Sequence, residues 1–275
     1  MMRIHESLKI RFYEIRMHKY IILIFSILIS ISTLKAENKV WSDGTAFTLP
    51  KKRYEIGLFQ PLRYGITENT ELITYPIWSL LFPNITIKKV WEDPCCFRFA
   101  TRHSINYPTQ FLKTISRSGI GGILPVLTKV PQLFVFTNHL LFSKAMTDEH
   151  VVSTKLGFTV VLSSGEMDMT TIDLPVVFPR TFVYQNGLSF SLGIDFDGQL
   201  YKSFNYTIDA DFFILGDDIT SYAFEHKAML TWIRSERFNL LLGYKFIYGE
   251  YPYGTDINIL PLLDIQFGRN RGVKE

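Results

Sequence analysis

Residues 187–214 read GLSFSLGIDFDGQLYKSFNYTIDADFFI, and this stretch decides the fold. Apolar residues occupy every second position over 188–196, and small or acidic residues occupy the positions between them. The same alternation returns over 204–212. A period of two places successive side chains on opposite faces of a strand. The Asp197-Gly198 pair between the two halves favours a tight turn, because both residues tolerate a positive φ. The stretch therefore predicts a β-hairpin with one apolar and one polar face.

The composition of the two faces favours a membrane barrel over a soluble sheet, which also alternates. The polar face carries no row of long lysines or glutamates, and the apolar face is rich in Phe. Similar segments follow at 221–233, 238–248 and 256–267. Alternating segments of about 10 residues separated by turns are typical of transmembrane barrel strands. Because backbone polar groups in lipid must be paired, such strands span a membrane only as a closed barrel.

The N-terminus predicts export. Residues 1–36 contain a basic region followed by an uncharged apolar run, YIILIFSILISIST. That run is shorter than the about 20 residues of a spanning helix and fits a signal peptide. Ala36 ends an imperfect cleavage site, so a retained anchor stays open, as does a start at Met17 instead of Met1. We expect residues 37–275 to form the barrel domain.

Connection lengths predict the topology, because long loops of bacterial barrels lie outside the cell and short turns lie in the periplasm. Eleven strands are clear, and an even number requires a twelfth, for which the lead-in at 44–50 is the candidate. Ten strands are the alternative if the segments broken by proline do not span. The short connections lie at 67–70, 92–96, 144–150, 197–199 and 234–236, and the longer ones at 108–130, 163–180 and 250–255, with 215–219 intermediate.

Residues 108–129 lack strand alternation. We expect a loop with one helical turn near 109–116. This loop either folds into the mouth of the barrel or packs its apolar residues on the rim.

The chain resembles bacterial outer-membrane β-barrel proteins of the porin-like, uncharacterised kind. The final strand ends LLDIQF at Phe267 and resembles the C-terminal signal that the barrel-assembly machinery reads, although residues 268–275 follow it. The segment RYGITENTELITY at 63–75 resembles a hairpin of uncharacterised members. The resemblance implies insertion among outer-membrane lipids, with the assembly machinery as a partner, and no particular activity. The oligomeric state stays open.

Neither cysteine nor histidine chemistry points to an enzyme. Cys95 and Cys96 alone cannot complete a zinc site, and adjacent cysteines form a disulfide only with strain. His103 and Ser104 are adjacent, so a strand would place them on opposite faces. We therefore expect no metal, no cofactor and no catalytic residues, with a lipid-acting enzyme as a distant alternative. The net charge of +3 without a basic block gives no indication of nucleic-acid binding.

The polar strand faces carry charges that we expect to face the lumen, since a lysine on the lipid side costs about 2–4 kcal/mol at the midplane. We expect Asp209 and Asp211 beside Ala223 and Glu225, and Lys245 near Glu225 or Lys227. Facing carboxylates repel, which favours a hydrated lumen that prefers cations at its outer mouth. The predicted function is a porin-like channel for small polar solutes, with a non-conducting structural or surface-interaction barrel as the alternative. The candidate lumen-facing charges are Lys155, Asp195, Asp209, Asp211, Glu225, Lys227 and Lys245.

Overall fold

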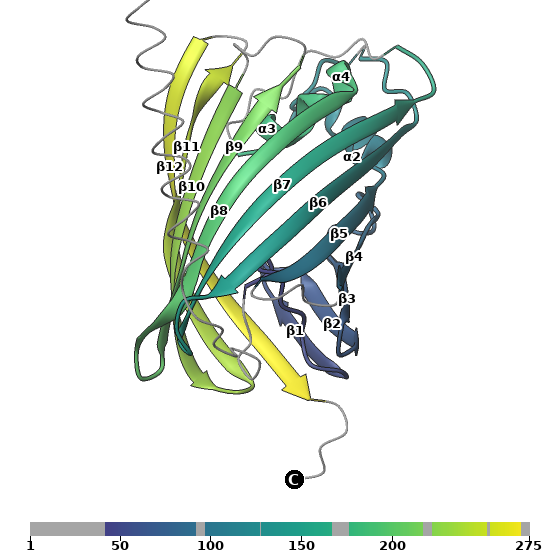
Figure 1. The fold of residues 1–275 in the computed structure, drawn as a ribbon. Helices are drawn as coiled ribbons and strands as arrows, with labels where there is room; N and C mark the ends of the chain where they lie inside the picture. The colour runs from purple at the N-terminus through teal and green to yellow at the C-terminus, as the bar shows by residue number, and fades with distance from the viewer. Residues whose placement is uncertain are drawn as a thin grey trace, which may run out of the picture.

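The structure, a computed structural model, describes residues 42–91, 97–126, 128–166, 176–216, 222–251 and 254–270. Within these residues twelve strands form one closed barrel, in which each strand runs antiparallel to its neighbours in the chain and β1 pairs with β12 (Figure 1). This confirms the all-β, antiparallel up-and-down barrel of twelve strands. The predicted signal peptide and Cys95 and Cys96 lie outside the described residues. No helix in the described part of the chain has the length and apolar character needed to cross a membrane.

The strands lengthen along the chain, from five residues at the N-terminus to 17 at the C-terminus. Three short helices lie in the described parts of the longer connections. The strands are β1 (Arg53–Gly57), β2 (Leu62–Thr67), β3 (Thr70–Thr74), β4 (Asn84–Val90), β5 (Arg98–Asn106), β6 (Leu133–Ala145), β7 (His150–Ser163), β8 (Leu188–Tyr201), β9 (Phe204–Leu215), β10 (Tyr222–Ser235), β11 (Phe238–Tyr251) and β12 (Gly254–Asn270). The helices are α2 (Thr109–Ile115), α3 (Phe178–Thr181) and α4 (Val183–Asn186).

The twelfth strand does not come from residues 44–50, so that prediction is wrong, and so is the ten-strand alternative. Residues 44–50 form no strand and lie largely buried inside the barrel. The extra strand arises because residues 53–66 fold as two strands, β1 and β2, with the chain reversing at 58–61. Proline has no N–H to give to a ladder, so the reversal at Pro61 ends the pairing instead of interrupting one long strand.

Two predicted connections also differ from the structure, one in position and one in length. Asp197 and Gly198 lie within β8, and the reversal into β9 occurs at Lys202 and Ser203, where Lys202 has a φ of 45°. The hairpin therefore extends beyond its apolar alternation. The predicted loop at 250–255 is shorter than expected, because β11 reaches Tyr251 and β12 begins at Gly254.

The alternation of the strands separates an apolar exterior from a polar interior. On β8, Phe190 and Leu192 are 50% and 55% exposed, whereas Asp195 and Asp197 are 1% and 3% exposed. Soluble monomers rarely expose apolar patches larger than a few hundred Å². The exterior therefore suits an apolar environment. Exposed apolar residues on the outer wall include Ile87, Phe134, Leu140, Phe158, Phe196, Phe212, Trp232, Leu242, Ile259, Leu263 and Phe267.

The helices lie at the end of the barrel that carries the longer connections (Figure 1). The predicted helical turn near 109–116 is confirmed as α2. Its Leu112 is buried with Leu133 of β6 and with Val183 and Tyr184 of α4. Phe178 of α3 forms a second buried cluster with residues of β9, β10 and β11. Apolar packing thus holds these loops in the mouth of the barrel.

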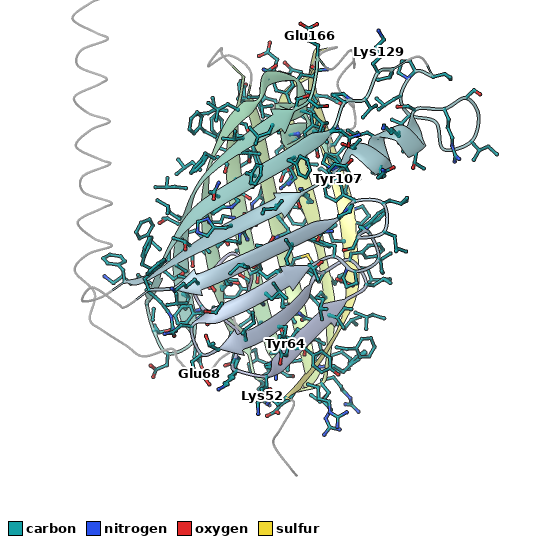
Figure 2. All side chains as sticks on the ribbon, turned by 90° about the vertical axis from the view of Figure 1, so that its right-hand side faces the viewer. Lys52, Tyr64, Glu68, Tyr107, Lys129 and Glu166 are labelled. Atoms are coloured by element: carbon teal, nitrogen blue, oxygen red, sulfur yellow. The ribbon has the colours of Figure 1, made fainter. Side chains whose placement is uncertain are left out.

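The wall has unequal height around its circumference. Figure 1 shows β1, β2 and β3 confined to the lower part of the barrel, whereas β11 and β12 rise to its upper end. A strand that spans a bilayer needs about 9–11 residues, and these three strands have five or six. Figure 2 views the molecule from the side on which these strands lie and labels Tyr64 on the low part of the wall.

Candidate functional site

The interior of the barrel contains a cavity of about 890 Å³. Its lining includes Glu236 and Asn270 at the end with the short turns, and Arg180 and Tyr184 at the end with the helices. Residues from both ends therefore border one cavity that follows the barrel axis. Charged and hydroxyl side chains predominate over much of this lining, which makes the lumen the candidate site.

The centre of the lumen is a cluster around Lys155 of β7. Its Nζ lies 2.8 Å from Asp195 Oδ1, 2.9 Å from Asp209 Oδ1 and 2.8 Å from Asp211 Oδ1. Asp195 lies on β8, and the other two aspartates lie on β9. One ammonium group thus joins carboxylates from two further strands.

Gly193 of β8 makes this reach possible. Lys155 pairs with Gly193, and Gly193 pairs in turn with Asp211 on the next strand. A Cβ atom at residue 193 would lie 2.4 Å from Lys155 Cε and 2.0 Å from Asp211 Oδ1. The missing side chain lets the lysine cross β8 and meet the acids of β9.

The remaining predicted charges form a second group around Glu225 of β10. Lys245 Nζ lies 2.9 Å from Glu225 Oε2, and Arg180 of α3 places its two terminal nitrogens 2.6 and 2.7 Å from the two carboxylate oxygens. Lys227 Nζ lies 3.2 Å from Asp209 Oδ2 and therefore belongs to the cluster around Lys155. The structure therefore places the seven predicted residues in two ionic groups, five around Lys155 and two around Glu225. Arg180 was missed, because an arginine in a loop carries no periodic signal.

The predicted register of β9 against β10 was shifted by two residues. Asp211 lies opposite Glu225, and Asp209 lies opposite Lys227 instead of Ala223 or Glu225. The acids of β9 meet lysines across the interior. Carboxylates also face one another as expected, Asp211 opposite Glu225 and Asp195 opposite Asp209, and the Lys155 ammonium group lies against three of these four acids.

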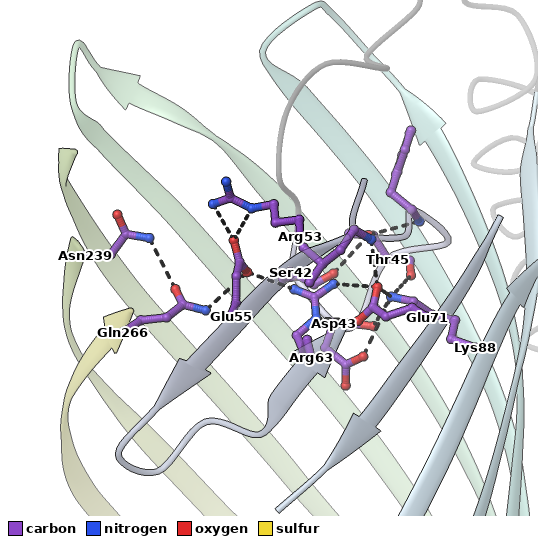
Figure 3. A network of polar contacts seen from close by, with 12 residues as sticks. Ser42, Asp43, Thr45, Arg53, Glu55, Arg63, Glu71, Lys88, Asn239 and Gln266 are labelled. Atoms are coloured by element: carbon purple, nitrogen blue, oxygen red, sulfur yellow. Dashed lines mark hydrogen bonds and ion pairs between the residues drawn. The ribbon is translucent and has the colours of Figure 1, made fainter. Parts of the chain in front are cut away.

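Residues 42–50, called here the lumenal segment, lie inside the barrel against the inner wall (Figure 3). The Ala46 N–H donates to Ser143 Oγ at 2.7 Å, and the Leu49 N–H donates to Glu71 Oε2 at 2.9 Å. The partners lie 97 and 22 positions away in the sequence. Side chains of the barrel wall therefore accept hydrogen bonds from backbone N–H groups of the lumenal segment, which would pair with a neighbouring strand if the segment were part of the sheet.

Asp43 anchors the start of the lumenal segment. Its Oδ2 accepts a hydrogen bond from Arg102 at 2.8 Å, and its Oδ1 lies 3.7 Å from Lys88 Nζ. Burial raises the pKa of Asp43, but Arg102, Lys88 and Arg63 together lower it more, so that the pKa lies below its usual range. The carboxyl group is therefore ionised at neutral pH.

The low strands carry their own row of alternating charges. Arg53 Nη2 lies 2.7 Å from Glu55, Arg63 bridges Glu55 and Glu71, and Lys88 lies 3.7 Å from Glu71 (Figure 3). Lys88 and Glu71 are fully buried. This row of charges was not predicted from the sequence, although the alternation with a period of two predicts that these side chains also face the lumen.

The lumenal segment lies in direct contact with β2. A Cβ atom on Gly65 would lie 2.2 Å from the Pro50 carbonyl oxygen and 2.7 Å from that of Leu49. Only glycine allows this approach. The segment is therefore packed on the wall as well as tied to it by charge.

Among solved structures, the chain matches parts of several larger proteins. OprD of Pseudomonas aeruginosa matches with 10% identity and a TM-score of 0.40 over 82% of this chain and 62% of that one. OccK8 (OprE) of Pseudomonas aeruginosa matches with 13% identity and a TM-score of 0.37 over 86% and 62%. The CymD monoaromatic hydrocarbon channel matches with 8% identity and a TM-score of 0.34 over 78% and 50%.

The chain thus spans between half and 62% of the length of these structures. At this level the likeness says nothing of how the present chain acts. No protein-family model and no curated protein sequence matches it.

Proposed function

We propose that the chain forms a channel in the bacterial outer membrane for small polar solutes. The observation that carries this proposal is the 890 Å³ cavity, lined by ionised side chains from both ends of a barrel whose exterior is apolar. Twelve strands give a barrel between the filled eight-stranded and the open 16-stranded classes. The lumen is therefore expected to pass small solutes and to restrict large ones.

The outer-membrane location is supported by the apolar exterior and by the final strand. Phe267 is 54% exposed on the outer face and stacks edge-on against Phe238, with ring centroids 5.6 Å apart. β12 continues past Phe267 to Asn270, so the predicted end of the strand at Phe267 is wrong, but the outward aromatic is still consistent with the C-terminal signal that the sequence resembles. We propose that the barrel-assembly machinery recognises this strand, and that residues 1–36 direct export.

Reconstitution of the mature chain in planar bilayers tests the channel. We expect discrete current steps, and swelling of protein-containing liposomes in small sugars but not in large dextrans. Asp209→Asn combined with Asp211→Asn should shift selectivity towards anions, because Lys155 then loses two carboxylate partners. Absence of current from a correctly folded barrel would contradict the proposal.

The alternative, a non-conducting structural barrel, is favoured by one specific observation. The lumenal segment occupies part of the interior and is held there by Arg102, Lys88, Glu71 and Ser143. Deletion of residues 42–50 separates the two functions. If the full chain does not conduct and the deletion variant does, the segment is a plug and the native barrel is closed.

A further inference from the structure

The seam between β1 and β12 is incomplete. β12 pairs with β11 over its whole upper length, from Gly254 to Phe267, but pairs with β1 only from Gln266 to Asn270. Among the described residues, no strand pairs with the β1-facing side of residues 257–263. The wall above β1 therefore has an open strand edge.

Two residues show that the sequence maintains this edge. Asp264 accepts hydrogen bonds from the backbone N–H groups of Leu58 at 2.8 Å, Phe59 at 3.2 Å and Gln60 at 2.9 Å. This carboxylate holds the reversal at 58–61 and ends β1 below the edge. Pro261 lies within the edge itself. Proline is confined to edge strands because it cannot donate to a ladder.

The orientation of Pro261 follows from the hydrogen bonds of β12. The Leu58 N–H donates to the Ile265 carbonyl oxygen, so the backbone of residue 265 points towards β1. Residues two apart on an antiparallel strand point their backbone groups to the same side. Residues 257, 259, 261 and 263 therefore face the gap, and Pro261 removes a donor where a neighbouring strand would need one.

The lumen reaches the floor of this gap. Gln60 and Pro61 of the first reversal, and Tyr75 and Phe82 of the β3–β4 connection, line the cavity. Around them the surface is apolar. Phe59, Ile77 and Leu80 are 68%, 64% and 89% exposed.

The gap therefore combines two kinds of surface. An apolar rim suits the acyl chains of a bilayer, whereas unpaired backbone groups in lipid cost several kcal/mol each. Within this edge the Ile257 N–H donates to Asp256 Oδ1 at 2.8 Å, and the remaining backbone groups that face the gap require water or polar ligand groups from the lumen. A molecule that satisfies both surfaces has an apolar body and a polar end.

We propose that the gap above β1, β2 and β3 is a lateral port through which small amphipathic molecules pass between the lumen and the bilayer. The proposal rests on the channel function and adds small amphipathic molecules to the small polar solutes proposed above. The polar end of the ligand meets the ionic lumen and the open edge, and its apolar body leaves between Phe59, Ile77 and the side of β12.

Lipid access tests the port directly. Gln60→Trp, in a chain whose four native tryptophans are changed to Phe, is reconstituted in vesicles of lipids brominated on the acyl chains. Thr159→Trp is the matched control, since Thr159 lines the same cavity from β7, across the ring from β1. We expect acrylamide in the water to quench both variants, and brominated lipid to quench only Gln60→Trp. Quenching of Gln60→Trp by acrylamide alone would overturn the port.

Ligand passage is tested with octanoate as the amphipathic probe and acetate as the polar one. Octanoate should reduce the single-channel current of the native barrel, and acetate should not. Labelling of Gln60→Cys with a bulky thiol reagent, with Cys95 and Cys96 changed to Ser, should abolish the octanoate effect and leave the current. If octanoate does not affect the current, the port is wrong and the channel function is retained. The same holds if cross-linking through residues 257–263 joins two copies of the chain in a dimer. Lipid quenching without any current would support the port and overturn the channel.

Discussion

Replacing Lys155 by Met should destabilise the barrel strongly. The ammonium group lies within 3 Å of Asp195, Asp209 and Asp211, and its side chain is 8% exposed. Removing one partner of a buried ion pair costs about 3–5 kcal/mol, because the opposite charge stays buried without compensation. That cost corresponds to a fall of roughly two to four orders of magnitude in the folding equilibrium constant. Lys227→Met is the matched control, since Lys227 approaches only Asp209 among the described carboxylates, at 3.2 Å, and its side chain is 35% exposed.

The assay is urea unfolding of the barrel in lipid vesicles, followed by the difference in gel mobility between folded and boiled samples. We expect Lys155→Met to lower the free energy of unfolding by about 3–5 kcal/mol. Lys227→Met should lower it by about 1 kcal/mol or less, as is usual for exposed ion pairs. Adding Asp195→Asn and Asp211→Asn to Lys155→Met should restore part of the loss. Equal effects of the two lysine substitutions, or none from Lys155→Met, would refute the reasoning and show that water compensates the acids.

Three further predictions concern the lumenal segment and the seam. Gly65→Ala should displace the segment and raise conductance, because the new Cβ would lie 2.2 Å from the Pro50 carbonyl oxygen, whereas Gly165→Ala, with its nearest neighbour at 3.9 Å, should leave the current unchanged. The lowered pKa of Asp43 means that its anchoring contribution is complete above the ordinary Asp value of about 3.9 and is lost as the pH falls through its own lower pKa. A rise in conductance caused by release of the segment should therefore appear only below pH 5, and release of the segment already near pH 6 would contradict this assignment. Asp264→Ala should leave four N–H groups without their acceptor and lower the temperature at which the gel mobility changes, whereas an unchanged temperature would show that water replaces the carboxylate.

The sequence predicted the parts of the fold that depend on local periodicity. The alternation over 188–196 identified which side chains of β8 face outwards, because a period of two is a property of the strand itself. The turn at Asp197-Gly198 was misplaced because turn propensity is weaker than ladder pairing. Thr207 of β9 and Ser42 of the lumenal segment both donate to Asp197, which binds this acid within the sheet.

The lumenal segment could not be predicted, because its position depends on partners far away in the chain. Ser42 meets Asp197 at a separation of 155 residues, and Ala46 meets Ser143 at 97. A short apolar stretch such as GTAFTLP also fits a strand, and nothing in it distinguishes the wall from the lumen. The clustering of charges across strands depends likewise on register, which an isolated strand pattern does not contain.

The short ladders at the start of the barrel give the cylinder a mechanical weak line. β11 and β12 are joined by a ladder from Phe238 to Tyr251, whereas β1 and β2 share only the pairs Tyr54–Tyr64 and Glu55–Arg63. Force or membrane tension applied to the ring concentrates where backbone bonds are fewest. Along this line ion pairs between side chains, rather than backbone hydrogen bonds, hold much of the contact between strands, and Arg63 bridges Glu55 and Glu71. The ring would therefore open first beside β1, at a strain threshold set by side-chain charge.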